Sequence, residues 1–211
     1  IVGDRGLRND SREVRLGILG AGHISHRFAS SLKKVDGARL VAAAGRTPAH
    51  VEEFSRAFSI DAAHGHASVD DNGDAAYDAL IADPDVDAIY LALPHGMHTR
   101  WACRALRAGK AVLCEKPAVL SEEEALLIAS TSRERGVLFM EAMKNRFCPM
   151  RTRVKDLLAS GELGRIVSIE SVQKLDYGES PSGYLLDPLQ GGCLYAVSYT
   201  HLRAHETVLD L

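Results

Sequence analysis

Short apolar runs alternate with amphipathic segments between residues 14 and 143. The run VRLGILG (14–20) ends in glycine, and the segment after it carries Ile24, Phe28 and Leu32 at fourfold spacing. Fourfold spacing puts the three side chains on one face of a helix. The pattern therefore predicts a strand, a tight turn and a helix.

The same unit recurs about five times. Further strands are predicted at 39–45, 87–94, 110–117 and 137–143, with a short strand or turn after residue 64, and further helices at 47–58, 75–82, 98–109 and 121–136. Because these strands are apolar throughout rather than alternating, both faces of their sheet should be covered. We predict an α/β fold for residues 13–143: a doubly wound parallel Rossmann sheet.

Sequence signals also predict where the helices begin. Thr47 can cap the second helix, with Pro48 in its first turn, and Val51, Phe54 and Phe58 form its apolar stripe. Ser121 and Glu124 have the spacing of a capping box, in which each side chain accepts a backbone N–H of the helix start.

The pattern changes after residue 143. One helix is predicted over 148–164, alternating apolar and polar positions follow over 165–177, and 178–192 has loop composition. Alternation is typical of an antiparallel sheet with one solvated face. We predict that residues 144–196 begin a second, truncated α/β domain with a mostly antiparallel sheet.

Charge and cysteine content favour a small-molecule partner in a reducing compartment. The 211 residues carry 25 basic and 28 acidic side chains, interspersed, so no basic stripe suggests nucleic acid. No apolar run reaches the roughly 18–20 residues of a membrane span, and the first residues are too polar for a secretory signal. The four cysteines form no C-x-x-C pair. We expect a cytoplasmic protein, with residues 1–12 outside the fold and the chain, which begins at Ile1, a piece of a longer reading frame.

The turn GAGHIS after the first strand is a candidate dinucleotide site. Gly20 permits the tight turn, and Gly22 lets a pyrophosphate approach the backbone at the helix N-terminus. Ser25 stands where the G-x-G-x-x-G fingerprint has its third glycine. The predicted cofactor contacts in this turn are Gly20, Ala21, Gly22, His23 and Ile24.

The residue after the second strand bears on which dinucleotide is bound. An NAD enzyme usually has Asp or Glu here, to bind the ribose hydroxyls, whereas this chain has Arg46. A guanidinium can bind a 2′-phosphate, so NADP is favoured over NAD. The alternative is that Arg46 is a solvated surface residue.

Two further strands end in polar loops at the ligand edge of such a sheet. LPHGMH places Leu93, Pro94, His95 and His98 there; the histidines could be metal ligands, but no third ligand is near, and we expect them to line a cofactor pocket. In CEKP, the ammonium of Lys116 could stabilise a developing substrate oxyanion.

These motifs occur in an order that resembles one known family. GILGAGHIS, LALPHGMHTRWACRALRAGKAVLCEKPAVLSEEEA, EAMKNRFCP and GELGRIVSIE together resemble the glucose-fructose oxidoreductase and inositol dehydrogenase family, Gfo/Idh/MocA, over residues 14–194. AMKNRFCP looks most like the branch of trans-1,2-dihydrobenzene-1,2-diol and D-xylose dehydrogenases, which prefer NADP.

The resemblance implies roles for several residues. It implies that Lys116 is the catalytic lysine, that Pro94, His95 and His98 line the cofactor site, and that Glu115 helps to hold the lysine loop. It also implies a polyol, sugar or dihydrodiol substrate and, through the second-domain sheet, a homo-oligomer.

The resemblance ends near residue 196. Gly191, Gly192, Cys193 and Leu194 match the family, but the aspartate position is Ala196 and a glycine position is Ser198. Tyr199 and His201 lie near the expected acid/base position but are not assigned, because the aspartate is absent. We expect residues 197–211 to be a non-native tail, since they resemble translated sequencing-adaptor DNA. On that interpretation the histidines of H-x-x-x-H-E (201–206) bind no metal. The alternative is a native amphipathic helix with solvated histidines.

Three functions remain in competition. The parent protein could be an NADP-dependent oxidoreductase that transfers a hydride between nicotinamide and a secondary alcohol, its general base lying beyond the authentic part of this chain. The chain itself could be a catalytically silent nucleotide-binding module. A structural or regulatory Rossmann protein without cofactor is the third possibility.

Overall fold

The computed structural model describes residues 13–69 and 73–168. The predicted loop at 178–192, the mostly antiparallel sheet and the tail from residue 197 lie outside them. Six strands form one sheet: β1 (Val14–Leu19), β2 (Ala38–Gly45), β3 (Gly65–Ala67), β4 (Ala88–Leu91), β5 (Ala111–Cys114) and β6 (Phe139–Glu141). Their order is β3-β2-β1-β4-β5-β6, and every pairing is parallel, which confirms the doubly wound parallel sheet.

The register brings the carboxyl ends of the central strands to one edge. Leu19 at the end of β1 pairs with Ala44 of β2 and Leu91 of β4, and Leu91 pairs in turn with Cys114 of β5. The segments that follow these strands are therefore neighbours in space. In a doubly wound sheet this edge is where ligands bind.

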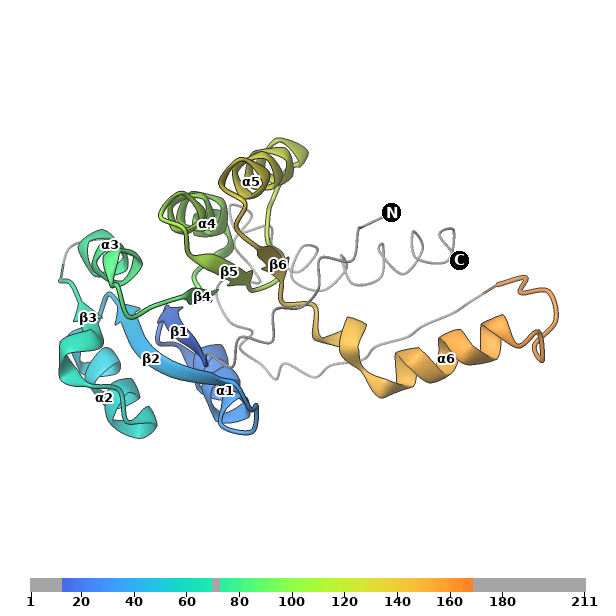
Figure 1. Ribbon diagram of the computed structural model, residues 1–211, viewed down its shortest axis with the longest axis horizontal. Helices are drawn as coiled ribbons and strands as arrows, with labels where there is room; N and C mark the ends of the chain where they lie inside the picture. Colours follow the sequence, from blue (N-terminus) through green and yellow to red (C-terminus); the bar gives the residue numbers. More distant parts are fainter. Residues whose placement is uncertain (1–12, 70–72, 169–211) are drawn as a thin grey trace, which may run out of the picture.

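Five helices cover the two faces of the sheet unequally (Figure 1). α1 (His23–Leu32) and α2 (Pro48–Phe58) lie on one face, and α3 (Asp74–Ala82), α4 (His98–Arg107) and α5 (Glu122–Arg135) lie on the other. Short 3-10 turns, η1 (Ala62–His64) and η2 (His95–Met97), precede β3 and α4. No helix within residues 13–69 and 73–168 combines the length and apolar character that crossing a bilayer requires.

Neighbouring residues of one strand serve opposite halves of the core. Ile18 and Tyr90 pack with α1 and α2, whereas Leu19 and Leu91 pack with the helices of the other face. All four side chains are at most 2% exposed. Both faces of the sheet must exclude water, which is why consecutive positions in the buried parts of the central strands are apolar.

The predicted helix starts have mixed outcomes. The Ser121 hydroxyl accepts the N–H of Glu124 at 3.3 Å, as predicted, while the Glu124 carboxylate accepts the N–H of Leu120 at 2.7 Å rather than that of Ser121. Thr47 does occupy the N-cap of α2, but its side chain makes no capping hydrogen bond. Only its backbone carbonyl serves the helix, accepting the N–H of Val51 at 3.1 Å.

The predicted apolar face of α1 is displaced by one residue. Ser25, Ala29 and Leu32 are the buried residues of α1, whereas Ile24 is 39% exposed. The reason is the unequal cover: beyond α1, no described helix packs on the part of this face formed by β5 and β6, so Ile24 borders a hollow rather than the core.

After β6 the chain leaves the sheet through η3 (Lys144–Phe147) into α6 (Pro149–Ala159), within the helix predicted at 148–164. None of the α6 residues is buried, and Met150 is 68% exposed. α6 thus adds nothing to the core of the first domain.

Candidate functional site

The turn after β1 requires glycine at its first position. Gly20 has φ +97°, and a Cβ built there would lie 2.5 Å from the carbonyl oxygen of Ala92, at the end of β4. Its N–H donates to the carbonyl of Ala44 at 2.8 Å, which ties the turn to β2. Left-handed backbone and close strand packing both exclude a side chain here.

Gly22, unlike Gly20, has open space where a side chain would be. It is the exposed N-cap of α1, and a Cβ built on it meets no atom within 4 Å. The first turn of α1 has neither a side-chain cap nor an acidic residue. The Ser25 N–H donates to the Gly22 carbonyl at 3.0 Å. Within the described residues the N–H groups of His23 and Ile24, with the positive end of the helix dipole, are thus available to an anion that approaches over Gly22.

Ser25 is a working replacement for the third glycine. Its side chain is fully buried, and its hydroxyl donates to the Gly20 carbonyl at 2.5 Å. The hydroxyl thereby links the first turn of α1 to the preceding loop. The departure from the three-glycine fingerprint does not disrupt the turn.

Arg46 stands directly after β2 at the same edge. It is exposed, and its stem lies over Gly73, where a Cβ would come within 2.6 Å of the Arg46 Cγ. Within the described parts of the chain, no hydrogen bond or ion pair engages its guanidinium. The charge is therefore available to an anionic group at the end of β2.

The loop after β4 places both apolar and polar side chains at this edge of the sheet. Leu93 is 8% exposed, Pro94 is exposed, and His95 is half-buried on η2, with its ring centroid 5.7 Å from that of His98. Pro94 and His95 are therefore the parts of LPHGMH that a ligand at this edge could reach.

His98 has a different position from the one predicted. Its side chain is fully buried, with Nδ1 2.8 Å from the carbonyl oxygen of Pro117 and Nε2 2.8 Å from that of Leu93. Burial lowers the pKa of His98, although the two carbonyl contacts act in the opposite direction. The ring offers no free nitrogen to a ligand or metal; it joins the loop after β4 to the loop after β5.

Glu115 is held by a tyrosine that none of the sequence motifs includes. The Tyr90 hydroxyl donates to Glu115 Oε1 at 2.6 Å, and Glu115 Oε2 accepts the Lys116 N–H at 3.2 Å. The Phe28 ring stacks on Tyr90, with centroids 3.8 Å apart. Burial, followed by the neighbouring carboxylate, raises the pKa of Tyr90, so the phenol stays a hydrogen-bond donor. A lone tyrosine in an otherwise aliphatic strand is the sequence signal that could have found it.

Several side chains fix the backbone around Lys116. Glu115 is bound to Tyr90, the Pro117 carbonyl contacts His98, and the Ala118 N–H donates to Glu141 Oε1 at 2.9 Å. The half-buried Lys116 side chain starts from this anchored loop. Such anchoring is what a group needs if it is to act on one substrate atom.

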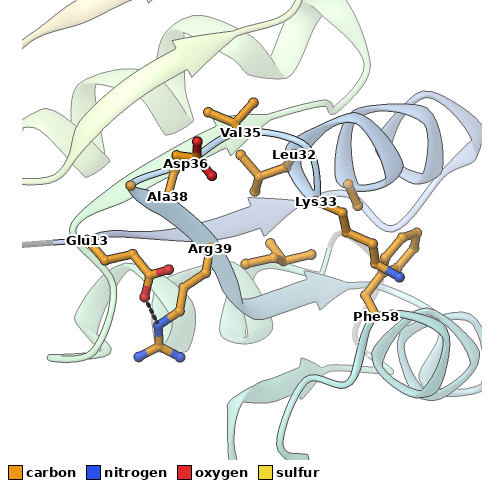
Figure 2. A pocket seen from close by; sticks show the side chains of 11 residues that line it. Glu13, Leu32, Lys33, Val35, Asp36, Ala38, Arg39 and Phe58 are labelled. Carbon is orange, nitrogen blue, oxygen red and sulfur yellow. Dashed lines mark ion pairs between the residues drawn. The ribbon is translucent and has the colours of Figure 1, made fainter.

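Lys116 borders a hollow of about 400 Å³ on the thinly covered sheet face. Its floor is mainly apolar, and its rim carries charge; the lining includes Phe28, Tyr90, Leu113 and Met140, with Arg27, Glu115, Lys116 and Lys144. A second hollow, of about 380 Å³, lies at the amino ends of β1 and β2, beside the 2.8 Å ion pair of Glu13 and Arg39 (Figure 2). No predicted site residue lines it, so the chemistry is to be sought at the Lys116 edge.

A family model described as "Oxidoreductase family, NAD-binding Rossmann fold" matches residues 14–143. This is the part of the chain that contains the complete parallel sheet and every predicted site residue. The match and the fold thus agree on one cofactor-type domain.

Curated relatives are similar over most of this chain. It is 34% identical over 168 residues to the trans-1,2-dihydrobenzene-1,2-diol dehydrogenase of Bos taurus, an alignment that covers 78% of this chain and 47% of the relative. It is 33% identical over 209 residues to D-xylose 1-dehydrogenase (NADP(+)) 2 of Haloferax volcanii, covering 93% and 61%. The chain therefore spans about half the length of the curated relatives it matches.

A solved structure supports the same comparison. The 3-ketoreductase KijD10 of Actinomadura kijaniata, crystallised with NADP and TDP-benzene, is 33% identical with a TM-score of 0.62, over 71% of this chain and 43% of that one. The three proteins are named for different substrates, so similarity alone does not select one.

Proposed function

The chain belongs to the Gfo/Idh/MocA family of oxidoreductases with an NAD-binding Rossmann fold, and on this premise we propose that it binds NADP and serves hydride transfer at a secondary alcohol. The observation that carries the proposal is a glycine turn with empty space above it, together with an arginine whose charge has no partner in the described part of the chain. A Cβ at Gly22 would enter empty space, and the Arg46 guanidinium has no partner within residues 13–69 and 73–168.

These residues fit the phosphates of the cofactor. The N–H groups at the start of α1 would hold the pyrophosphate, and Gly22 keeps that approach clear. Arg46 would bind the 2′-phosphate bidentately, a contact that NAD cannot make. Pro94 and His95 would border the cofactor from the loop after β4. Two relatives support this choice, because KijD10 was crystallised with NADP and the name of the Haloferax volcanii enzyme includes NADP(+).

Lys116 would be the catalytic residue. When bound, NADP supplies the acceptor for the hydride that leaves the alcohol carbon. The Lys116 ammonium would donate to the substrate oxygen and stabilise its negative charge as the hydroxyl proton departs. Tyr90, Glu141 and His98 fix the loop that carries it. The base that takes the proton is not assigned to a residue of this chain.

The remaining elements of the proposal concern the whole protein. Residues 13–143 would be the cofactor domain, and residues 144–196 would begin a second domain that supplies most of the substrate contacts. The substrate would be a sugar, polyol or dihydrodiol, as the names of the relatives suggest. We further propose a homo-oligomer in the cytoplasm that engages neither nucleic acid nor membrane.

Cofactor binding and turnover test the proposal separately. Titration of the 211-residue chain with NADPH should change the fluorescence of NADPH. NADPH should bind more tightly than NADH. Absence of any NADPH binding would refute the proposal and favour a Rossmann protein without cofactor. Binding without oxidation of D-xylose, inositols or dihydrodiols would instead support the catalytically silent module for this chain.

Where turnover is measurable, Lys116→Ala should lower kcat by about 10²–10³ while the Kd for NADPH stays within about twofold. Lys155→Ala, on exposed α6, is the matched control and should leave both unchanged. Normal turnover by Lys116→Ala would remove the lysine from the chemistry.

A further inference from the structure

A cluster of histidines and aspartates lies at the edge of the sheet opposite the Gly22 and Lys116 loops. His64 ends η1 and His66 lies on β3, while Asp83 and Asp85 belong to the loop between α3 and β4. The amino ends of β3 and β4 are thereby joined through side chains that the cofactor edge does not use.

Each imidazole in the cluster faces a carboxylate. His64 Nδ1 is 2.6 Å from Asp83 Oδ2, and His64 Nε2 is 3.7 Å from Asp85 Oδ2. His66 Nε2 is 3.5 Å from the same Asp83 oxygen. That nitrogen is buried and has no well-formed hydrogen bond, although its ring points at an acceptor. A buried ring nitrogen without a hydrogen bond is unusual, because its desolvation is uncompensated.

The carboxylates are held in place by other groups. Asp83 is 5% exposed, and its Oδ1 accepts the Asp85 N–H at 2.8 Å. Arg15 binds Asp85 Oδ1 at 2.6 Å, which leaves Oδ2 facing His64. Lys110 Nζ binds the Asp83 carbonyl at 2.8 Å, so the loop that carries both aspartates is fixed.

Local structure fixes the positions of the two histidines as well. Asp61 caps η1 by accepting the Ala63 N–H at 2.9 Å, and the single turn that follows ends at His64. Pairing of β2 with β3 sets His66 opposite Ala44. Strand, turn and loop therefore converge on one point before any ligand is present.

We propose that His64, Asp83 and Asp85 form a three-residue binding site for a divalent transition metal of the zinc type, with the fourth position left to water. One ligand atom from each of the three residues lies within 4.8 Å of the others. Ligands about 2.0–2.2 Å from a tetrahedral ion are about 3.3 Å apart. The 2.6 Å pair of His64 Nδ1 and Asp83 Oδ2 must therefore open by about 0.7 Å, and the Asp85 carboxylate must approach the same nitrogen, for the three groups to share one ion.

The donor set selects the kind of metal. An imidazole with two carboxylates suits zinc, cobalt or nickel, whereas calcium and magnesium prefer oxygen ligands alone. The Asp83 carboxylate and the part of the Asp85 charge that Arg15 does not offset would oppose the charge of a divalent ion. Bound there, the ion would tie β3 to the loop before β4, far from Lys116, so its role would be structural rather than catalytic.

Metal titration of the purified 211-residue chain, freed of metal by a chelator, tests the site. One equivalent of Zn²⁺ should bind by calorimetry and raise the thermal midpoint, and Co²⁺ should give a visible spectrum without a thiolate band. His64→Gln and Asp85→Asn, at partly exposed positions, should each weaken binding more than about tenfold. His50→Ala, exposed on α2, is the control and should bind normally.

Three outcomes would overturn the site. The first is no stoichiometric binding of either metal. The second is binding that persists in His64→Gln but is lost when His201 and His205 are both replaced by alanine, which would assign the metal to the C-terminal H-x-x-x-H-E segment. The third is a cobalt–thiolate band, which would assign the metal to a cysteine such as exposed Cys148.

Discussion

The two glycines of the first turn should fail in different ways when each is changed to alanine. In Gly20→Ala the new methyl group must share space with the Ala92 carbonyl, 2.5 Å away, on a backbone with φ +97°. A left-handed conformation costs a non-glycine residue about 1–2 kcal/mol, and overpacking costs about 1–3 kcal/mol more. We therefore expect the free energy of unfolding to fall by about 2–5 kcal/mol.

Gly22→Ala meets neither obstacle. Its φ of −97° suits any residue, and its methyl group would have no neighbour within 4 Å. Loss of a favourable N-cap should cost about 1 kcal/mol or less. In contrast, a methyl group over the helix N-terminus would displace the pyrophosphate, and loss of one charge-assisted hydrogen bond, worth about 1.5–3 kcal/mol, corresponds to a tenfold or greater rise in the Kd for NADPH.

Urea and thermal unfolding measure the first effect, and NADPH fluorescence titration measures the second. For a domain of this size, the loss in Gly20→Ala corresponds to a thermal midpoint lower by roughly 5–15 °C. Wild-type unfolding of Gly20→Ala would refute the close approach of β1 and β4. Wild-type NADPH affinity in Gly22→Ala would refute the proposed path of the pyrophosphate.

Three further predictions concern charge and burial. Arg46→Ala should weaken NADPH binding about tenfold or more but leave NADH binding unchanged, as fluorescence titration with both cofactors would show. His98→Ala should lower the free energy of unfolding by about 3 kcal/mol, because two buried carbonyls lose their partner and a cavity forms, whereas His50→Ala should not change it. Burial lowers the pKa of His98 in the folded state, so its contribution to stability is present above pH about 6.5 and is lost as the pH falls. Urea titrations across pH should show that His98→Gln reduces this dependence. Tyr90→Phe should cost about 1–3 kcal/mol in the same unfolding assay, because Glu115 loses its donor; no change would mean that another group holds Glu115.

Local signals in the sequence were sufficient for the fold. Apolar runs of strand length, fourfold spacing in the helices and glycines at the turns predicted the doubly wound sheet and nearly every element. The stripe of Val51, Phe54 and Phe58 is confirmed, with Val51 3% exposed and Phe54 fully buried. These signals report which face a residue shows to the core, and that depends on neighbours only a few positions away.

The same signals gave wrong predictions where a side chain had a choice of partners. Thr47 has the residue type and position of a cap, yet its hydroxyl makes no capping bond, and Ile24 belongs to the predicted stripe but is 39% exposed. A capping propensity is a weak preference, and a stripe cannot tell whether another helix will cover its margin. In both cases the surroundings decided the outcome.

The sequence by itself determined the parallel sheet, the glycine turn and the edge at which Arg46, Pro94 and Lys116 lie, because each follows from the periodicity or backbone demand of a short segment. Only the tertiary structure decided that His98 spans 19 residues to the Pro117 carbonyl, that Tyr90 spans 25 to Glu115, and that His64 spans 19 to Asp83. These contacts depend on the register between strands and on how helices pack across them. A contact between distant residues is set when the whole sheet assembles, and no local pattern encodes it.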